Sequence, residues 1–180
     1  MLTVREMTSS DKDAVRSISN ATASGIYKNK PEATQLLFCD YYADNGIGFL
    51  LCDGDKIAGY VLCSEDYKKY IKLYKLGYLE KLKKADKKEY LNKKFSLIFD
   101  RLMGKRYPAH LHIDILESYC GGTGKLLMEP LLNRLKKDNI RGVWLGVDPQ
   151  NVRAVKFYKK FGFTSKGIFK LFSVYTLKIT

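Results

Sequence analysis

Three glycines lie in a short loop after the most strand-like stretch of the chain. The stretch Ala109–Leu116 reads AHLHIDIL, and Gly121, Gly122 and Gly124 follow it at the start of a predicted helix. A helix N-terminus presents free backbone N–H groups and the positive end of the helix dipole, and glycine lets an anion approach them. Lys125 adds positive charge. The segment predicts a phosphate or pyrophosphate site, although the loop alone is as often only a turn.

Two other phosphate-binding motifs do not fit this loop. The pattern GxxxxGK[ST] of a P-loop is absent. The chain does not open with a β–α unit of the Rossmann kind. If the glycines bind a phosphate, they therefore do so in a motif other than a P-loop or a Rossmann fold.

Titratable side chains alternate along the same predicted strand. Alternation places His110, His112 and Asp114 on one face. Polar groups in the middle of a sheet are costly to bury without partners. They are candidates for a general base that faces a substrate, and the alternative is a hydrogen-bonded trio that supports the sheet. Asp148, at the end of the next predicted strand, is a further candidate.

The cysteine pattern does not indicate a metal site. Four cysteines occur without a C-x-x-C pair, and the chain has only two histidines. A structural zinc site is not expected, and reduced thiols in a cytoplasmic protein are the simple interpretation. Cys120 has no evident base partner in the sequence, which argues against a thiol nucleophile.

Hydrophobic periodicity and turn residues predict the elements that position these groups. Strands are expected at Leu2–Met7, Gly48–Cys52, Lys56–Cys63, Ala109–Leu116, Gly142–Val147, Phe163–Phe169 and Leu171–Ile179. Helices are expected from Ser9 or Ser10 to about Ala21, from Pro31 to about Asn45, over most of 66–104 with one helix at Lys87–Met103, at Gly121–Leu135 with a kink at Pro130, and at Asn151–Phe161.

Positive charge is concentrated in the helical segment 66–108. This segment has 14 Lys and Arg against 5 Asp and Glu, in a chain of net charge +13. Its tyrosines and lysines alternate at helical spacing, which could suit a polyanion. A helix that buries its tyrosines and leaves its lysines in water is the favoured interpretation. Nucleic-acid binding is therefore not the expected function.

Length and composition indicate one globular domain over residues 1–180. The chain is 46% hydrophobic and 13% aromatic, which is too apolar for a disordered protein. No apolar run reaches the roughly 18 residues of a membrane span, and the N-terminus has no signal-peptide core. A cytoplasmic location is expected.

The second half of the chain resembles the GNAT family of N-acetyltransferases. The stretches HLHIDIL, GGTGKLLMEPLL and GVWLGVDPQNVRAVKFYKKFGF are similar to the acetyl-CoA-binding core of that family. The family pattern N-x-x-A-x-x-F-Y-x-x-x-G-F is matched by Asn151, Ala154, Phe157, Tyr158, Gly162 and Phe163. A narrower resemblance, over most of residues 47–163, is to the acetyltransferase-like domain of O-GlcNAcases and its stand-alone bacterial relatives.

The resemblance implies an α/β fold with a mixed, mostly antiparallel sheet of about seven strands, flanked by helices and carrying a helical insertion at 66–108. It also implies acetyl-CoA as co-substrate and an amine as acceptor. Tyr158 would be the general acid, and Asp114 is the candidate base or substrate contact. The implied acetyl-CoA-binding residues are Ile115, Leu116, Tyr119, Cys120, Gly121, Gly122, Thr123, Gly124, Lys125, Asn151 and Phe157.

The loop departs from the family pattern Q/R-x-x-G-x-G/A at its first position. Either Tyr119 or Cys120 stands where the family has Gln or Arg. Two alternatives to an active acetyltransferase therefore stay open. One is a non-catalytic relative that binds acyl-CoA or a protein in the same cleft, and the other is a basic nucleic-acid-binding module. A homodimer is a further option.

Overall fold

The computed structural model describes residues 1–169 and 172–179. Its strands are β1 (Leu2–Glu6), β2 (Ile47–Asp53), β3 (Lys56–Ser64), β4 (Ala109–Ile115), β5 (Gly142–Val147), β6 (Thr164–Phe169) and β7 (Phe172–Lys178). Its α-helices are α1 (Lys12–Thr22), α2 (Pro31–Phe38), α3 (Asp40–Asn45), α4 (Tyr67–Gly77), α5 (Leu79–Ala85), α6 (Lys87–Gly104), α7 (Gly124–Lys137) and α8 (Val152–Lys160). None of the helices in the described ranges has the length and apolar character of a membrane span.

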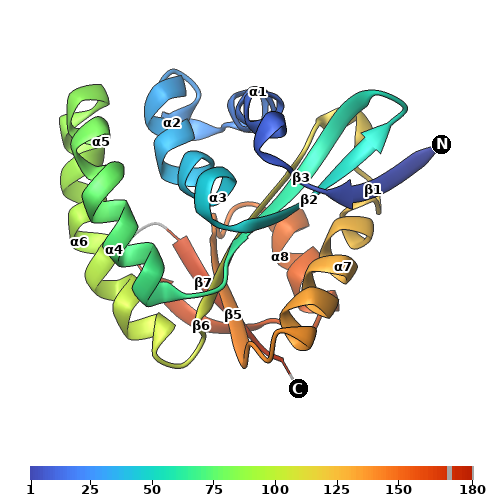
Figure 1. The fold of residues 1–180 in the computed structure, drawn as a ribbon. Helices are drawn as coiled ribbons and strands as arrows, with labels where there is room; N and C mark the ends of the chain where they lie inside the picture. The colour runs from blue at the N-terminus through green and yellow to red at the C-terminus, as the bar shows by residue number, and fades with distance from the viewer. Residues whose placement is uncertain (170–171, 180) are drawn as a thin grey trace.

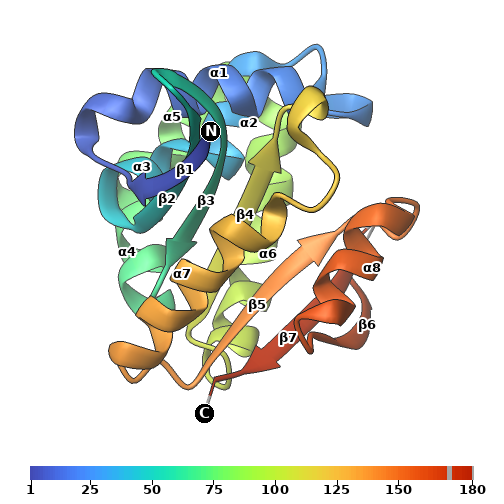
Figure 2. The ribbon, with the colours of Figure 1, turned by 90° about the vertical axis from the view of Figure 1, so that its right-hand side faces the viewer.

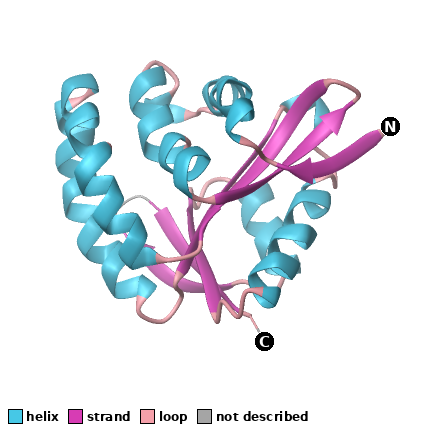
Figure 3. Cartoon of the chain, in the orientation of Figure 1, coloured by secondary structure: helices cyan, strands magenta, loops and turns pink. Residues whose placement is uncertain are grey.

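One sheet runs through the molecule in the order β1-β2-β3-β4-β5-β7-β6 (Figures 1 and 3). Every neighbouring pair is antiparallel except β4 and β5. The predicted fold class, a mixed and mostly antiparallel seven-stranded sheet with flanking helices, is confirmed. The hairpin of β2 and β3 turns at Gly54, whose φ of 58° favours glycine.

Strand alternation divides the core into two layers. Tyr60 and Leu62 of β3 pack with α1, α2 and α3, whereas Val61 and Cys63 pack with α7 on the other face. All four side chains are fully buried, as expected of a central strand that is covered on both faces. Figure 1 shows α1–α3 and α7–α8 on opposite sides of the sheet.

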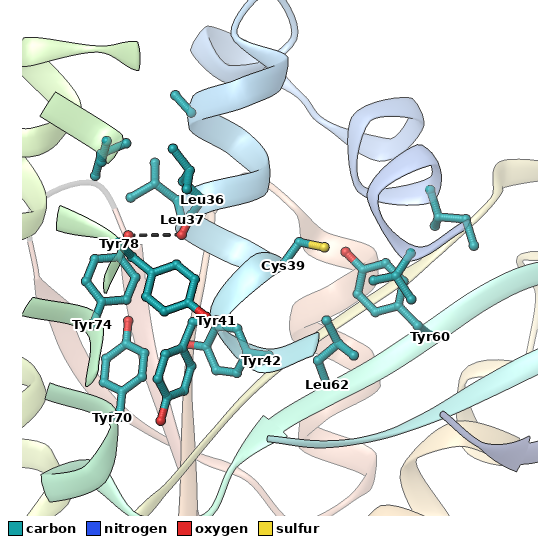
Figure 4. Packing of buried hydrophobic residues seen from close by; sticks show 14 of the residues in the cluster. Leu36, Leu37, Cys39, Tyr41, Tyr42, Tyr60, Leu62, Tyr70, Tyr74 and Tyr78 are labelled. Atoms are coloured by element: carbon teal, nitrogen blue, oxygen red, sulfur yellow. Dashed lines mark hydrogen bonds between the residues drawn. The ribbon is translucent and has the colours of Figure 1, made fainter. Parts of the chain in front are cut away.

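The insertion forms the helices α4, α5 and α6 beside α2 and α3. Its tyrosines at 70, 74 and 78 are buried against Tyr41 of α3, with ring centroids 4.6–6.3 Å away (Figure 4). The Tyr74 hydroxyl donates a hydrogen bond of 2.9 Å to the Leu36 carbonyl oxygen. The tyrosines are therefore core residues and cannot stack on a polyanion. The exposed lysines between them are the solvated face that the sequence predicted.

Three predicted helices differ from the structure in detail. The helix predicted from Pro31 to Asn45 breaks at Cys39, whose φ of −127° lies outside the helical range. The segment 66–86 forms two helices that meet at Tyr78. The helix predicted from Gly121 begins at Gly124 and continues through Pro130. Residue 171, predicted to open the last strand, lies outside the described residues.

The two parallel strands separate soon after they meet. Pairing between β4 and β5 is confined to Ala109 with Val143 and His110 with Trp144. Figure 2 shows the strands diverging toward their C-terminal ends. The rest of β4 is paired on its other side with β3, through Gly59 to Ser64. One edge of β4 therefore opens into the space between the strands.

Candidate active site

A cleft of about 640 Å³ lies at the C-terminal end of β4. Its walls are the end of β4, the glycine loop, one face of α8 and the end of α1. Most of the site residues predicted from the sequence meet here. Its lining residues are Ala21, Thr22, Ile113, Asp114, Ile115, Leu116, Glu117, Cys120, Gly121, Gly122, Thr123, Gly124, Asn151, Arg153, Ala154, Lys156, Phe157, Tyr158 and Lys160.

The glycine loop exposes backbone N–H groups to an anion in the cleft. Gly121 and Gly122 have φ values of 114° and 118°, which L side chains rarely adopt. Apart from the adjacent residues, no atom lies within 4 Å of the position that a Cβ would take at either glycine. At Gly124 a Cβ would lie 2.8 Å from the ring of Phe157, so glycine lets α7 approach α8. In the described chain the N–H groups from Gly121 to Gly124 have no intramolecular acceptor. They remain available to a ligand at the N-terminus of a 14-residue helix.

The edge of β4 supplies further backbone groups. Because β5 leaves β4 after His110, the groups of Leu111 to Ile115 that face the cleft have no strand partner on that side. A free strand edge binds an extended chain that carries its own amide groups. Ile113 and Ile115 border the cleft from this edge.

A basic face of α8 lines the opposite wall. Arg153, Lys156 and Lys160 stand at spacings of three and four residues, so they share one side of the helix, and all three border the cleft. The sequence analysis did not single out these residues. Their helical spacing could have identified them, because they share a face of the helix with Phe157, which the family pattern predicts at the site. Asn151 caps the helix, and its side chain accepts a hydrogen bond of 3.0 Å from the Ala154 amide.

Tyr158 lies at the inner end of the cleft. It is 7% exposed, and its ring centroid is 5.3 Å from that of Phe157. Burial, and to a smaller extent the negative charge of Asp114, raises the pKa of the Tyr158 hydroxyl. The hydroxyl therefore stays protonated through the physiological range and can donate a hydrogen bond or a proton.

Asp114 enters the cleft from β4. Its Oδ2 accepts a hydrogen bond of 2.5 Å from the hydroxyl of Tyr60, which lies directly opposite on β3. Burial raises the Asp114 pKa, whereas hydrogen bonds from Tyr60 and Thr22 lower it by less. A carboxylate with a raised pKa is a better proton acceptor than an exposed one.

The two histidines lie away from the cleft lining. His110 Nδ1 is 2.6 Å from the Tyr42 hydroxyl oxygen, and His112 Nε2 is 3.2 Å from it. The His110 ring also stacks on Trp144 at 4.1 Å. Burial lowers the pKa of both rings, that of His112 to about 3. They fit the alternative interpretation, that of a hydrogen-bonded group inside the fold.

The structure places the remaining predicted residues as follows. All predicted catalytic and cofactor-binding residues line the cleft except Tyr119 and Lys125. Tyr119 instead donates a hydrogen bond of 3.2 Å to Asp53, and Lys125 is exposed on α7. Asp148 is also outside the lining, and its side chain accepts a hydrogen bond from the Gln150 amide in a turn.

Cys120 borders the cleft with its thiol directed at the backbone. Its Sγ lies 3.6 Å from the Ile115 carbonyl oxygen and 3.7 Å from that of Leu116. The thiol thus ties the loop to the end of β4. Sequence reasoning did not find Ala21 and Thr22, which come from α1 and reach the cleft only through the fold.

Comparison with known proteins agrees with this geometry. Residues 105–163 match the model of the acetyltransferase (GNAT) family. No curated protein sequence matches the chain significantly. Among solved structures, that of SsHAT is 24% identical with a TM-score of 0.83, covering 99% of this chain and 98% of that one.

Two further structures come from named organisms. An N-acetyltransferase from Staphylococcus aureus Mu50 has 15% identity and a TM-score of 0.64, covering 100% of this chain and 99% of that one. The paiA N-acetyltransferase from Thermoplasma acidophilum, determined with coenzyme A, has 12% identity and a TM-score of 0.60, covering 99% of both chains. The predicted resemblance to the GNAT family is therefore confirmed, and the match to SsHAT extends over the helical insertion.

Proposed function

We propose that this chain, a protein of the GNAT family, transfers an acetyl group from acetyl-CoA to an amine. The observation that carries the proposal is the convergence of three features in one cleft. These are the free amides of the glycine loop, the open edge of β4 and the buried hydroxyl of Tyr158. Together they match three groups of acetyl-CoA, which are its diphosphate, its amide-bearing arm and its thioester.

The cleft would hold the cofactor along its length. The diphosphate would accept hydrogen bonds from the amides between Gly121 and Gly124. The two amides of the pantetheine arm would pair with the open edge of β4, as an added strand does. The cations of α8, Arg153 and Lys156 among them, would meet the remaining phosphate charge. The thioester would then reach the inner end of the cleft, near Tyr158.

Direct transfer requires a neutral amine, which attacks the thioester carbonyl carbon. An alkyl amine is mostly protonated at pH 7, so a proton must first leave its nitrogen. Asp114, whose pKa is raised by burial, would accept that proton directly or through water. A backbone N–H at the end of β4, from Ile115 or Leu116, would stabilise the oxyanion. When the C–S bond breaks, the Tyr158 hydroxyl donates a proton to the departing thiolate.

The proposal is tested by measuring CoA thiol release from acetyl-CoA in the presence of a panel of amines. We expect turnover with at least one amine class, and a loss of about 100-fold or more in kcat for Tyr158→Phe, because a general acid contributes on that order. Acetyl-CoA binding should change little. Tyr175→Phe is the matched control, since Tyr175 is equally buried in the same cluster but lies outside the cleft lining.

Two outcomes would reject parts of the proposal. Full turnover in Tyr158→Phe would remove Tyr158 from the reaction. Tight acetyl-CoA binding without acetyl transfer to any amine class would favour the non-catalytic alternative, in which the cleft only binds the cofactor.

A further inference from the structure

The longest helix of the insertion has apolar side chains on two opposite sides. Its inner side carries Leu97, which is buried in the core with the tyrosines of α4. The apolar side chains of Phe95, Ile98 and Leu102 lie on the outer side of the helix instead. The outer stripe, which we call the α6 stripe, consists of Leu91, Phe95, Ile98 and Leu102, which are 56%, 56%, 61% and 62% exposed.

The spacing of the α6 stripe is that of a helix–helix seam. Its residues are separated by four, three and four positions, which is the a/d pattern of a heptad. A narrow stripe of this kind matches the apolar face of another helix. Phe95 also has a contact within the fold and still exposes more than half of its surface. The stripe spans roughly 16 Å along the helix, at 1.5 Å per residue.

The flanking charge indicates the chemistry of the partner. Lys87, Lys94 and Arg101 repeat every seven residues beside the stripe, at the heptad position that borders a partner helix. The acidic residues of α6, Glu89 and Asp100, are both buried on the other side of the helix. The exposed side of α6 therefore carries an apolar stripe, and the charged residues beside that stripe are all cationic. A second copy would place like charges opposite each other, which disfavours self-association.

We propose that the α6 stripe is a docking site for an amphipathic helix that carries acidic residues beside its own apolar seam. The apolar side chains supply the contact area, and the acidic residues pair with the cations at positions 87, 94 and 101. The contact is short, so the complex is a transient one that weakens as salt concentration rises. This site lies outside the acetyl-CoA cleft and does not depend on the proposed reaction.

The test uses a synthetic peptide of about 21 residues, three heptads long, with Leu at a and d and Glu at e and g. Its glutamates repel each other at neutral pH, so it does not cover its own seam. Binding to the full chain is measured by fluorescence anisotropy. We expect Ile98→Gln to weaken binding about tenfold or more, because an aliphatic contact is lost. Leu76→Gln is the matched control, since Leu76 is 74% exposed on α4.

Charge is tested separately from apolar contact. The double variant K94E/R101E should prefer a peptide with Lys at e and g over the Glu peptide. The control K68E/K75E has the same seven-residue spacing on α4 and should keep the original preference. These substitutions lie on exposed positions, and circular dichroism verifies that each variant is folded.

Three results would overturn the proposal. The first is equal binding of the Glu and Lys peptides, or binding of neither. The second is a dimer of the chain, detected by analytical ultracentrifugation, that is lost in the Ile98→Gln variant, since a second copy would then cover the stripe. The third is stripe-dependent binding to vesicles of phosphatidylcholine and phosphatidylserine in preference to the Glu peptide, since a membrane surface would then be the partner.

Discussion

At the scale of single residues, the three polar side chains of β4 have different surroundings. Alternation correctly predicted that His110, His112 and Asp114 share one face of the strand. It could not tell which of them reaches a cleft, because that depends on Tyr42, which is 68 and 70 positions away from the two histidines. Packing buries both rings around the Tyr42 hydroxyl, while Asp114 borders the site.

The burial of His112 predicts a pH-dependent contribution to stability. Its pKa is about 3 in the folded chain and about 6.5 when unfolded, so the unfolded state binds more protons between these values. The free energy of unfolding therefore loses up to about 1.4 kcal/mol per pH unit from this residue as pH falls below 6.5. In His112→Asn this contribution is absent. Urea unfolding at pH 6.5 and pH 5 should show a flatter dependence in the variant.

The comparison centres on His112 because the other titrating groups, the buried His110 among them, are present in both proteins. Asp114, whose pKa is raised, acts in the opposite direction in each. Identical slopes for the wild type and His112→Asn between pH 6.5 and 5 would mean that the ring is hydrated or charged in the folded state.

At the scale of elements, the family sequence pattern identifies only some of the residues through which α8 lines the cleft. The family pattern predicted Asn151, Phe157 and Tyr158 as site residues, and all three line the cleft. It says nothing of Arg153, Lys156 or Lys160. Their role follows only when the helix is packed against the glycine loop, because that contact decides which side of α8 faces the cofactor site.

Charge reversal on α8 should weaken acetyl-CoA binding on one side of the helix only. Lys156→Glu places a negative charge at the cleft, and we expect a dissociation constant about tenfold higher, or about 1.4 kcal/mol, in low salt. Lys159→Glu changes net charge equally but lies outside the lining, so it should have little effect. Isothermal titration calorimetry measures both. Equal losses in the two variants would mean that the charged wall acts only through the overall field.

The insertion contains a buried ion pair that its sequence did not reveal. On α6, Lys93 Nζ lies 3.0 Å from Asp100 Oδ2, and the two side chains are 10% and 7% exposed. The ammonium group also lies 5.0 Å from the ring of Tyr70. In a segment with many exposed lysines, nothing in the local pattern marks this lysine as buried. Only the packing of α6 on α4 makes the distinction.

Removing one partner of this ion pair should lower the free energy of unfolding. Asp100→Leu leaves the Lys93 ammonium buried without a counter-ion, and we expect a loss of about 3–5 kcal/mol in the free energy of unfolding. The double variant Lys93→Met/Asp100→Leu removes both charges and should recover most of that loss. Denaturant titration measures the three proteins. A double variant as unstable as the single one would show that the pair is not the source of the cost.

At the scale of the whole molecule, hydrophobic periodicity predicted the order of elements, and the family resemblance implied the mixed sheet. It could not predict the separation of β4 from β5 or the arrival of Ala21 and Thr22 at the cleft. Both depend on contacts between segments about 30 to 100 residues apart. The cleft is therefore a property of the assembled fold, whereas the glycine loop that lines it is visible in the sequence.

The central claim is that this cleft binds acetyl-CoA, and thermal unfolding with and without the cofactor tests it most directly. At about 100 times the dissociation constant, one-site binding should add about 2.7 kcal/mol of stability, and Tm should rise by roughly 5–10 °C. Lys156→Glu should need a higher concentration for the same rise. An unchanged Tm at millimolar acetyl-CoA would contradict the claim.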